Sequence, residues 1–453
     1  MKREIDMCHG PLLGNILRYT LPLICTGLLQ LLFNAADLVV VGRFCGSVSV
    51  GAVGATSALI NLIIYLFIGL SVGVGVTVAQ SIGAGQEEST RQAVHTAVPV
   101  ALISGLALTV LGVWLAPQVL RWMGTPADVI GLSTVYVRVY FCGMIPSMVY
   151  NYGGAILRAA GDSKSPLLYL SIAGVVNVAL NVLFVTAFDM DVAGVALATA
   201  LSQLLSAALV VRALMRRTDA CRLDWRQLRI HKRSLLQMVR IGLPAGVQGW
   251  MFSLSNVLIQ SAVNSFGSMA VSGNAAASSI EGFVYVAMNA FYQTAMNFTG
   301  QNIGARQYNR VRQICRVSLM CVAVTGLVLG VGVYLLRRPL LGIYITDSPE
   351  ALAVGMQKML CICFPYALCG VMEVLTGVLR GMGASFVPML MSVVGICGLR
   401  VVWIGTVFQH FHTLPSLFIS WPISWVILIV ALSLTYLVLY RRLTKQASEV
   451  VHE

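Results

Sequence analysis

Most of this 453-residue sequence divides into apolar stretches of roughly 20 to 28 residues, the length that an α-helix needs to cross about 30 Å of hydrocarbon. Hydrophobic residues make up 58% of the chain and charged residues only 10%, which lies outside the range of water-soluble domains. A backbone in lipid must satisfy its own hydrogen bonds, so we predict an all-α integral membrane protein. Twelve transmembrane helices are expected, at residues 14–40, 51–80, 92–115, 131–158, 166–188, 193–215, 235–265, 272–301, 312–336, 350–379, 386–408 and 415–440.

The distribution of basic residues predicts the orientation of these spans. Lys and Arg near span ends tend to remain in the cytoplasm. With the N-terminus inside, 23 of the 30 Lys and Arg residues fall in inner segments. This predicts a multi-pass protein of the cell membrane, plasma or inner, with both termini cytoplasmic. It also accounts for the net charge of +13 without nucleic acid. The first residues lack the pattern of a cleaved signal peptide, so the first span is expected to stay in the membrane.

An internal repeat at an offset of about 222 residues predicts the architecture. Its anchors are Leu21-Pro22 with Leu243-Pro244, the segments beginning at Gln80 and Gln301, Pro117 with Pro339, and the segments 157–166 and 379–388. Six spans separate equivalent points, so both halves enter from the same side and are expected to be two six-helix bundles related by a pseudo-two-fold axis along the membrane normal. The predicted parts are an N-terminal bundle at 1–215, a basic cytoplasmic linker at 216–234, a C-terminal bundle at 235–441 and a cytoplasmic tail at 442–453.

Several kinds of chemistry are missing from the sequence. No Gly-Lys pair occurs, so the chain has no phosphate loop of the GxxxxGK[ST] type. All six histidines lie in expected loops or at span ends, which disfavours an intramembrane metal site or a general base. We therefore predict no enzyme, no cofactor and no catalytic residue. The run from Gly69 to Gly75 superficially resembles a nucleotide loop, but inside a span it indicates close helix packing.

Polar side chains at membrane depth are expensive and therefore mark candidate sites. Asp37 lies in the first span, where its carboxylate is a candidate ligand for H⁺ or Na⁺; the alternative is a solvated acid at a helix end near Arg43. Asn177 and Asn181 lie one turn apart in the fifth span, and Asn151 lies in the fourth. These amides either assist the cation at Asp37 or serve only as hydrogen bonds between helices. No metal is expected beyond Na⁺ at Asp37.

A second set of polar residues is expected to line a substrate cavity. Arg400 needs a buried partner, and Glu281 or Glu373 is a candidate for a structural ion pair with it. Glu373 occupies the position of Asn151 in the repeat, each seven residues before its paired Arg. A structural and a functional role for these charges remain open at this point. The cavity candidates are Asn34, Gln248, Asn256, Glu281, Tyr292, Glu373 and Arg400.

Taken together, these motifs resemble the multidrug and toxic compound extrusion (MATE) family of antiporters over nearly the whole chain. The resemblance is carried by Leu21-Pro22 to Arg43, by the Gln-x-x-Gly-Ala segments at Gln80 and Gln301, by the Leu-Arg-x-x-Gly segments at Arg158 and Arg380, and by 177–181 with 194–199. It implies alternating access and places the family's first-helix acid at Asp37. Acids that family members carry on helix five or helix seven are absent here, where helix five has Asn181, so the coupling ion stays open between H⁺ and Na⁺.

We therefore expect a monomeric secondary active exporter that exchanges H⁺ or Na⁺ for organic, cationic or amphiphilic compounds. One rival is a flippase or exporter of lipid-linked sugars or cell-wall precursors, which would favour a cationic cavity for phosphates. A weaker rival is a receptor or scaffold without transport. The sequence names neither the substrate nor the ion.

Overall fold

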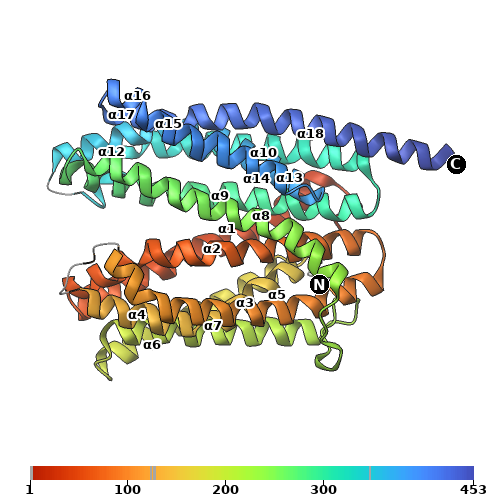
Figure 1. Ribbon diagram of the computed structural model, residues 1–453, viewed down its shortest axis with the longest axis horizontal. Helices are drawn as coiled ribbons and strands as arrows, with labels where there is room; N and C mark the ends of the chain where they lie inside the picture. Colours follow the sequence, from red (N-terminus) through yellow and green to blue (C-terminus); the bar gives the residue numbers. More distant parts are fainter. Residues whose placement is uncertain (1–3, 123–124, 126–128, 346–347, 453) are drawn as a thin grey trace. The chain divides into compact units, whose positions relative to one another are not determined.

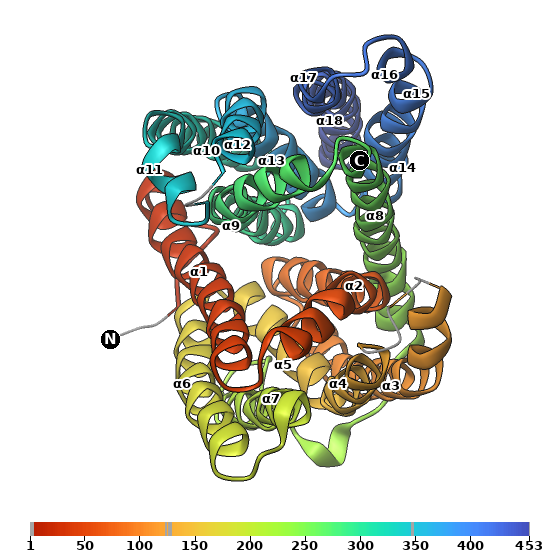
Figure 2. The same ribbon diagram turned by 90° about the vertical axis from the view of Figure 1, so that its left-hand side faces the viewer.

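A computed structural model describes residues 4–122, 125, 129–345 and 348–452, and all secondary structure in these residues is helical. The helices form two compact units, which are described separately below. Unit 1 comprises Met1–Asp6 and Leu21–Trp250, and unit 2 comprises Met7–Thr20 and Met251–Glu453. Figure 1 follows the helices along the chain, and Figure 2 views them end-on within each unit.

Unit 1 consists of long helices connected by short turns. They are most of α1 (Leu12–Phe44), α2 (Ser47–Gly83), α3 (Glu87–Trp122), α4 (Ile130–Cys142), α5 (Met144–Ala159), α6 (Lys164–Thr186), α7 (Asp191–Met215), the 3₁₀ turn η1 (Trp225–Gln227) and the first part of α8 (Lys232–Asn264).

Unit 2 takes the rest of α8 and the remaining helices. These are α9 (Ser268–Gly304), α10 (Tyr308–Leu335), α11 (Arg337–Gly342), α12 (Pro349–Ile362), α13 (Tyr366–Gly381), α14 (Phe386–Ser392), the π-helical turn η2 (Val393–Gly398), α15 (Leu399–Gly405), α16 (Val407–His410), α17 (Leu414–Phe418) and α18 (Ser420–His452).

The divisions between the units fall inside α1 and α8, which differs from the predicted parts 1–215 and 235–441 with a linker at 216–234. The start of α1 packs within unit 2, where Thr20 Oγ1 lies 2.8 Å from Thr294 Oγ1 and Asn297 Nδ2 donates to the Tyr19 hydroxyl at 3.2 Å. The first part of α8 packs within unit 1. The sequence could not show this, because an uninterrupted helix carries no mark at the place where its packing partners change.

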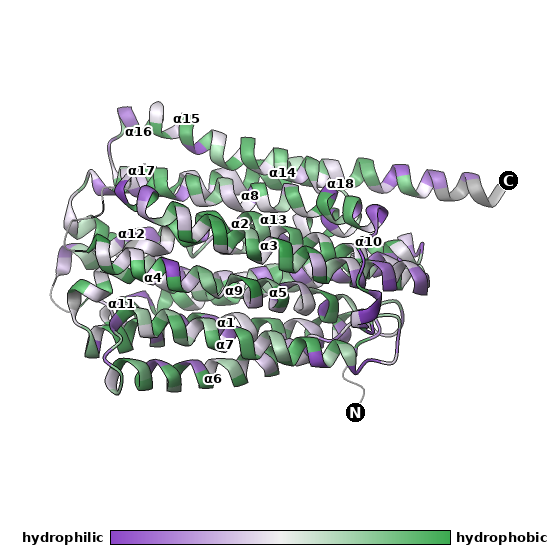
Figure 3. Cartoon of the chain, turned by 60° about the horizontal axis from the view of Figure 1, so that its bottom comes forward, coloured by the Kyte–Doolittle hydropathy of each residue, from purple (hydrophilic) through white to green (hydrophobic). Residues whose placement is uncertain are grey.

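Each predicted span lies on a helix or a run of helices. Eight described helices are long and apolar enough to cross a membrane, and ten result if the bent pairs α4–α5 and α12–α13 each count as one span. The spans predicted at 235–265 and 272–301 correspond to α8 and α9, whose composition alone does not qualify them as spans. Both are rich in amides and hydroxyls. Figure 3 shows hydrophobic residues along most helices and hydrophilic residues gathered toward helix ends.

The repeat predicted from the sequence is visible in the backbone. The α4–α5 pair bends by 48° and the α12–α13 pair by 49°. Gly46 and Gly267, which precede α2 and α9, have φ values of 93° and 89°. Glycine tolerates this left-handed region because it has no Cβ. Equivalent positions of the two halves thus share special backbone conformations, which hydrophobic composition alone would not produce.

The segment after α7 is docked on unit 1 rather than extended from it. His95 Nε2 on α3 accepts from the Asp224 backbone N–H at 3.1 Å, and Thr96 Oγ1 accepts from the His231 N–H at 3.1 Å. Partial burial would raise the pKa of Asp219, but its hydrogen bond and ion pair with Arg217 hold that pKa below its ordinary value. Leu223 of this segment is buried in the protein.

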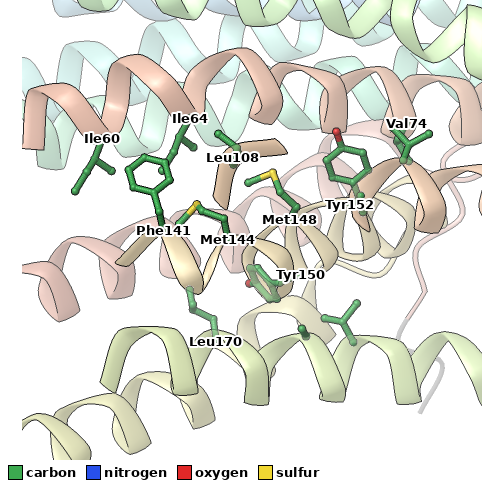
Figure 4. Packing of buried hydrophobic residues seen from close by; sticks show 14 of the residues in the cluster. Ile60, Ile64, Val74, Leu108, Phe141, Met144, Met148, Tyr150, Tyr152 and Leu170 are labelled. Carbon is green, nitrogen blue, oxygen red and sulfur yellow. The ribbon is translucent and has the colours of Figure 1, made fainter. Parts of the chain in front are cut away.

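Aromatic and aliphatic side chains from several helices fill the core of unit 1. Figure 4 shows Ile60 and Ile64 of α2 facing Leu108, Phe141 and Met144 from α3, α4 and α5. Phe141 is fully buried, and Gly112 on α3 makes room for its ring. Small residues therefore set how closely the helices of this core approach one another.

The glycines of α2 allow close backbone contact with the first part of α8, as the run at Gly69–Gly75 predicted. A Cβ at Gly69 would lie 2.8 Å from the Gly242 carbonyl oxygen, and one at Gly73 would lie 2.8 Å from the Gly242 nitrogen. These are distances that real Cβ atoms do not adopt. Paired glycines on both helices, at 69 and 73 and at 242 and 246, make this contact possible.

We expect Gly73→Ala to destabilise the protein, because the added methyl forces α2 away from α8 at a cost of about 1 to 3 kcal/mol. Gly54→Ala on the same helix is the matched control, since a Cβ there meets nothing within 4 Å. In the control, alanine's helix propensity should leave stability equal or higher. Thermal unfolding of the two purified variants in detergent measures the difference, and equal midpoints would contradict this contact.

Candidate functional site

The candidate cation site in unit 1 begins with a close contact between α1 and α6. A Cβ at Gly174 would overlap the ring of Phe33, so the missing side chain on α6 is what admits this ring. Asp37 follows Phe33 by one helical turn, and Asn177 and Asn181 follow Gly174 by one and two turns. The notch at Gly174 therefore sets the register in which the acid of α1 faces the amides of α6.

The polar side chains on the two helices form a continuous network. Asn181 Nδ2 donates to Asp37 Oδ1 at 2.5 Å and to Asn177 Oδ1 at 3.3 Å. Asn177 Nδ2 lies 3.4 Å from the Thr199 hydroxyl of α7, to which it donates. Asn181 is fully buried, and Asp37 is partly buried. This network of side chains thus links helices α1, α6 and α7.

This network offers oxygen ligands to a small hard cation. Asn181 Oδ1 is buried and has no hydrogen-bond partner in the described part of the chain, next to the carboxylate of Asp37. A buried acceptor without a partner is uncommon in proteins. Carboxylate and amide oxygens together suit H⁺ or Na⁺, and Asp37 supplies the only formal charge of the network.

The structure argues against the alternative in which Asp37 is a solvated acid at a helix end. Helix α1 continues to Phe44, seven residues beyond Asp37, and Arg43 is exposed. The tyrosines Tyr136 and Tyr140 of α4 lie within electrostatic range of the Asp37 carboxylate. Asp37 therefore lies within α1, with α6 and α4 beside it, rather than at a helix end.

Not every predicted member of the cation site joins this network. Asn151 on α5 donates to the Ser147 carbonyl of its own helix at 2.8 Å, and the structure shows no contact between it and Asp37, Asn177 or Asn181. Thr199 does join the network. In the sequence it appeared only in the segment 194–199, which resembles the MATE family, and no role was predicted for it. Its distance of 22 residues from Asn177 hides a contact that depends on how α6 and α7 pack.

The predicted cavity residues belong to both units. Asn34 on α1 is exposed, and Gln248 on α8 is buried, both in unit 1. In unit 2, Tyr292 of α9 accepts a hydrogen bond from Arg380 Nη1 at 2.5 Å. Glu373 of α13 is buried and has Tyr285 as its hydrogen-bond partner. Arg380 also interacts electrostatically with Glu373, so these residues form one cluster within unit 2.

The expected ion pair of Arg400 with Glu281 or Glu373 does not form. Arg400 Nη1 donates instead to Ser255 Oγ at 3.3 Å and to Asn256 Oδ1 at 3.2 Å. Glu281 is paired with Lys358 at 3.5 Å. The Lys358 side chain is buried and donates to the Ser278 hydroxyl. The predicted span 350–379 contains this lysine, but its burial depends on the rotation of the helix, which the sequence does not show.

Within the described ranges of the chain, no group of three or more His, Cys, Asp and Glu side chains has the arrangement of a metal site.

Comparisons with known proteins agree with the repeat and the fold. The MatE family model matches the chain twice, over residues 22–183 and 244–404. The probable multidrug resistance protein YoeA of Bacillus subtilis (strain 168) is 28% identical over 418 residues, covering 90% of each chain.

Solved structures show the same fold. A crystal structure of a MATE protein in complex with MaL6 aligns with a TM-score of 0.90 at 20% identity and covers 98% of this chain and 100% of its own. An outward-facing multidrug resistance MATE transporter aligns with a TM-score of 0.88 at 21% identity over 99% of each chain. The relatives are transporters and not enzymes, as predicted. Since the family model covers most of the sequence in two tandem copies, the chain belongs to the MatE family, the multidrug and toxic compound extrusion transporters.

Proposed function

We propose that this protein is a monomeric secondary active exporter of the cell membrane that exchanges an entering H⁺ or Na⁺ for an organic, cationic or amphiphilic compound. The observation that carries the proposal is the Asp37–Asn181–Asn177 network in unit 1. The names of the relatives, which are multidrug resistance proteins, support the substrate class. The bias of 23 of 30 basic residues toward inner segments supports cytoplasmic termini.

The proposed coupling follows from the charge of one carboxylate. With no cation bound, Asp37 is negative and depends on the Asn181 amide for stabilisation. A bound H⁺ or Na⁺ neutralises the carboxylate and competes with that amide for its oxygens. Since the hydrogen bond joins α1 to α6, its loss changes the preferred packing of α1 in unit 1. Substrate release is then coupled to this change.

The membrane potential supplies part of the driving force. One charge moved across 100 mV is worth about 2.3 kcal/mol. This is sufficient to shift a two-state equilibrium by roughly 50-fold. A single carboxylate that binds and releases one cation can therefore bias the transport cycle without ATP.

We expect Asp37→Asn to reduce ion-coupled export by about 10- to 50-fold, because the amide cannot bind the driving cation. The assay uses proteoliposomes with ethidium under separately imposed Na⁺ and pH gradients, and the effective gradient identifies the ion. Asp189→Asn is the matched control: Asp189 is exposed and has a φ of 49°, a conformation that Asn tolerates. Normal coupled efflux by the Asp37 variant, at equal protein levels, would exclude this carboxylate from coupling.

The sequence predicted both Asn151 and Asn181 in the cation site, but only Asn181 bonds to Asp37, so the two asparagines should respond differently to substitution. Asn181→Leu removes a hydrogen bond that stabilises the ionised carboxylate of Asp37, worth about 1.5 to 3 kcal/mol, and should lower the cation concentration for half-maximal transport by about tenfold or more. Asn151→Leu should change it by less than about twofold, because this amide bonds only to its own helix among the described residues. Initial rates against cation concentration test both variants. Equal shifts in the two would show that the network does not define the site.

A further inference from the structure

Unit 2 contains a buried arginine without an acidic partner. Arg400 lies in the apolar span Phe386–His410 and is only 5% exposed. A guanidinium at this depth is costly and remains charged, so it normally has a buried counter-charge. Arg400 forms no ion pair among the described residues: its Nη1 donates to Ser255 and Asn256, both neutral, and its Nε is buried without a hydrogen-bond partner.

The nearby charges are already engaged. Glu281 interacts electrostatically with Arg400, but its carboxylate forms an ion pair with Lys358 at 3.5 Å. Glu373 is hydrogen-bonded to Tyr285 and interacts with Arg380. Neither acid provides a direct contact to the Arg400 guanidinium. One face of this guanidinium instead lies over the ring of Trp421, at 4.6 Å from its centroid.

The backbone before Arg400 is unusual in a way that fixes its direction. The π-helical turn η2 (Val393–Gly398) ends two residues before Arg400. An extra residue in a helical turn rotates every later side chain by about 100° relative to a continuous α-helix. Such turns are rare and frequently lie at functional sites. The sequence therefore retains a costly irregularity that directs Arg400 toward Ser255 and Asn256.

The internal repeat relates this cluster of Arg400, Ser255 and Asn256 to the candidate cation site of unit 1. An offset of about 222 residues relates Ser255 and Asn256 of α8 to Phe33 and Asn34 of α1, and relates the α14–η2–α15 run to α6. The pair of helices that holds Asp37 and Asn181 in unit 1 thus corresponds to the pair that holds Asn256 and Arg400 in unit 2. One copy presents a negative group, and the other presents a positive group.

We infer that Arg400, Ser255 and Asn256 form a subsite in unit 2 for the oxyanion group, a carboxylate or phosphate, of a transported organic compound. The inference rests on the proposed export function and extends its substrates to zwitterions. The unpartnered Nε and the neighbouring Nη groups form the planar edge that binds such a group through two hydrogen bonds. Asn256 is exposed, so the cluster is not sealed inside unit 2.

Two dyes that differ only in this group provide the test. A rhodamine with a free carboxylate and its methyl ester are compared for binding to the purified protein and for gradient-driven transport in proteoliposomes. We expect Arg400→Gln to weaken binding and transport of the acid about tenfold more than those of the ester. Arg400→Lys should give an intermediate result, because lysine keeps the charge but loses the planar edge. Arg138→Gln, which removes an arginine from unit 1, is the control and should not discriminate.

A second variant protects the test against misfolding of Arg400→Gln. Asn256→Asp places a carboxylate on the guanidinium, so it should raise the unfolding temperature while lowering acid transport selectively. Equal effects on both dyes, or no effect, in both variants would overturn the subsite. So would loss of a co-purified anionic lipid from Arg400→Gln without dye discrimination, which would assign the site to a lipid headgroup. Discrimination in binding without gradient-driven transport of either dye would instead contradict the proposed export function and leave the subsite intact.

Discussion

A peptide backbone in hydrocarbon has no water to accept or donate its hydrogen bonds, and the structure of this protein follows from that constraint. Helices satisfy the backbone internally, so apolar side chains can face lipid along most of their length. The few polar side chains inside the spans then bond to backbone carbonyls of their own helix or pair with each other across helices. Each such pair therefore fixes the relative position of two or three helices, as Asp37, Asn181 and Asn177 do for α1, α6 and α7.

The two halves show how one helical scaffold carries different chemistry. Both retain the bend in the fourth span and the left-handed glycine before the second. The side chains at equivalent places have diverged: α1 and α6 join through a carboxylate and an amide, while α8 and α15 join through an amide and a guanidinium. The backbone conformation has been kept because packing depends on it. The polar side chains have changed because each of them contacts only a few neighbouring residues.

The sequence was informative wherever the signal is local or periodic. Span length and the packing role of Gly69 and Gly73 could be predicted, because each depends on residues close together in the chain. The repeat could be predicted because its prolines and glycines recur at a fixed offset. Asp37 and Asn181 were also placed in one candidate site, and the structure brings them into contact.

Contacts that depend on helix rotation were not predictable. Asn151 points along its own helix, and Arg400 meets Asn256 because a π-helical turn precedes it. No sequence pattern predicts that π-helical turn or the burial of Lys358. The polar composition of α8 and α9 was readable, but which neighbours their amides meet was not.

The sharing of α1 and α8 has a consequence for the origin of the chain. The start of α1, up to Thr20, packs in unit 2, and the rest of α1 packs in unit 1. Helix α8 is divided after Trp250, with its start in unit 1 and its remainder in unit 2. If the chain arose by duplication of a six-helix ancestor, this exchange of helix starts is the arrangement expected of a swapped dimer. Fusion then made this exchange permanent. If the chain were cut in the segment between α7 and α8, neither half would keep all of its packing contacts.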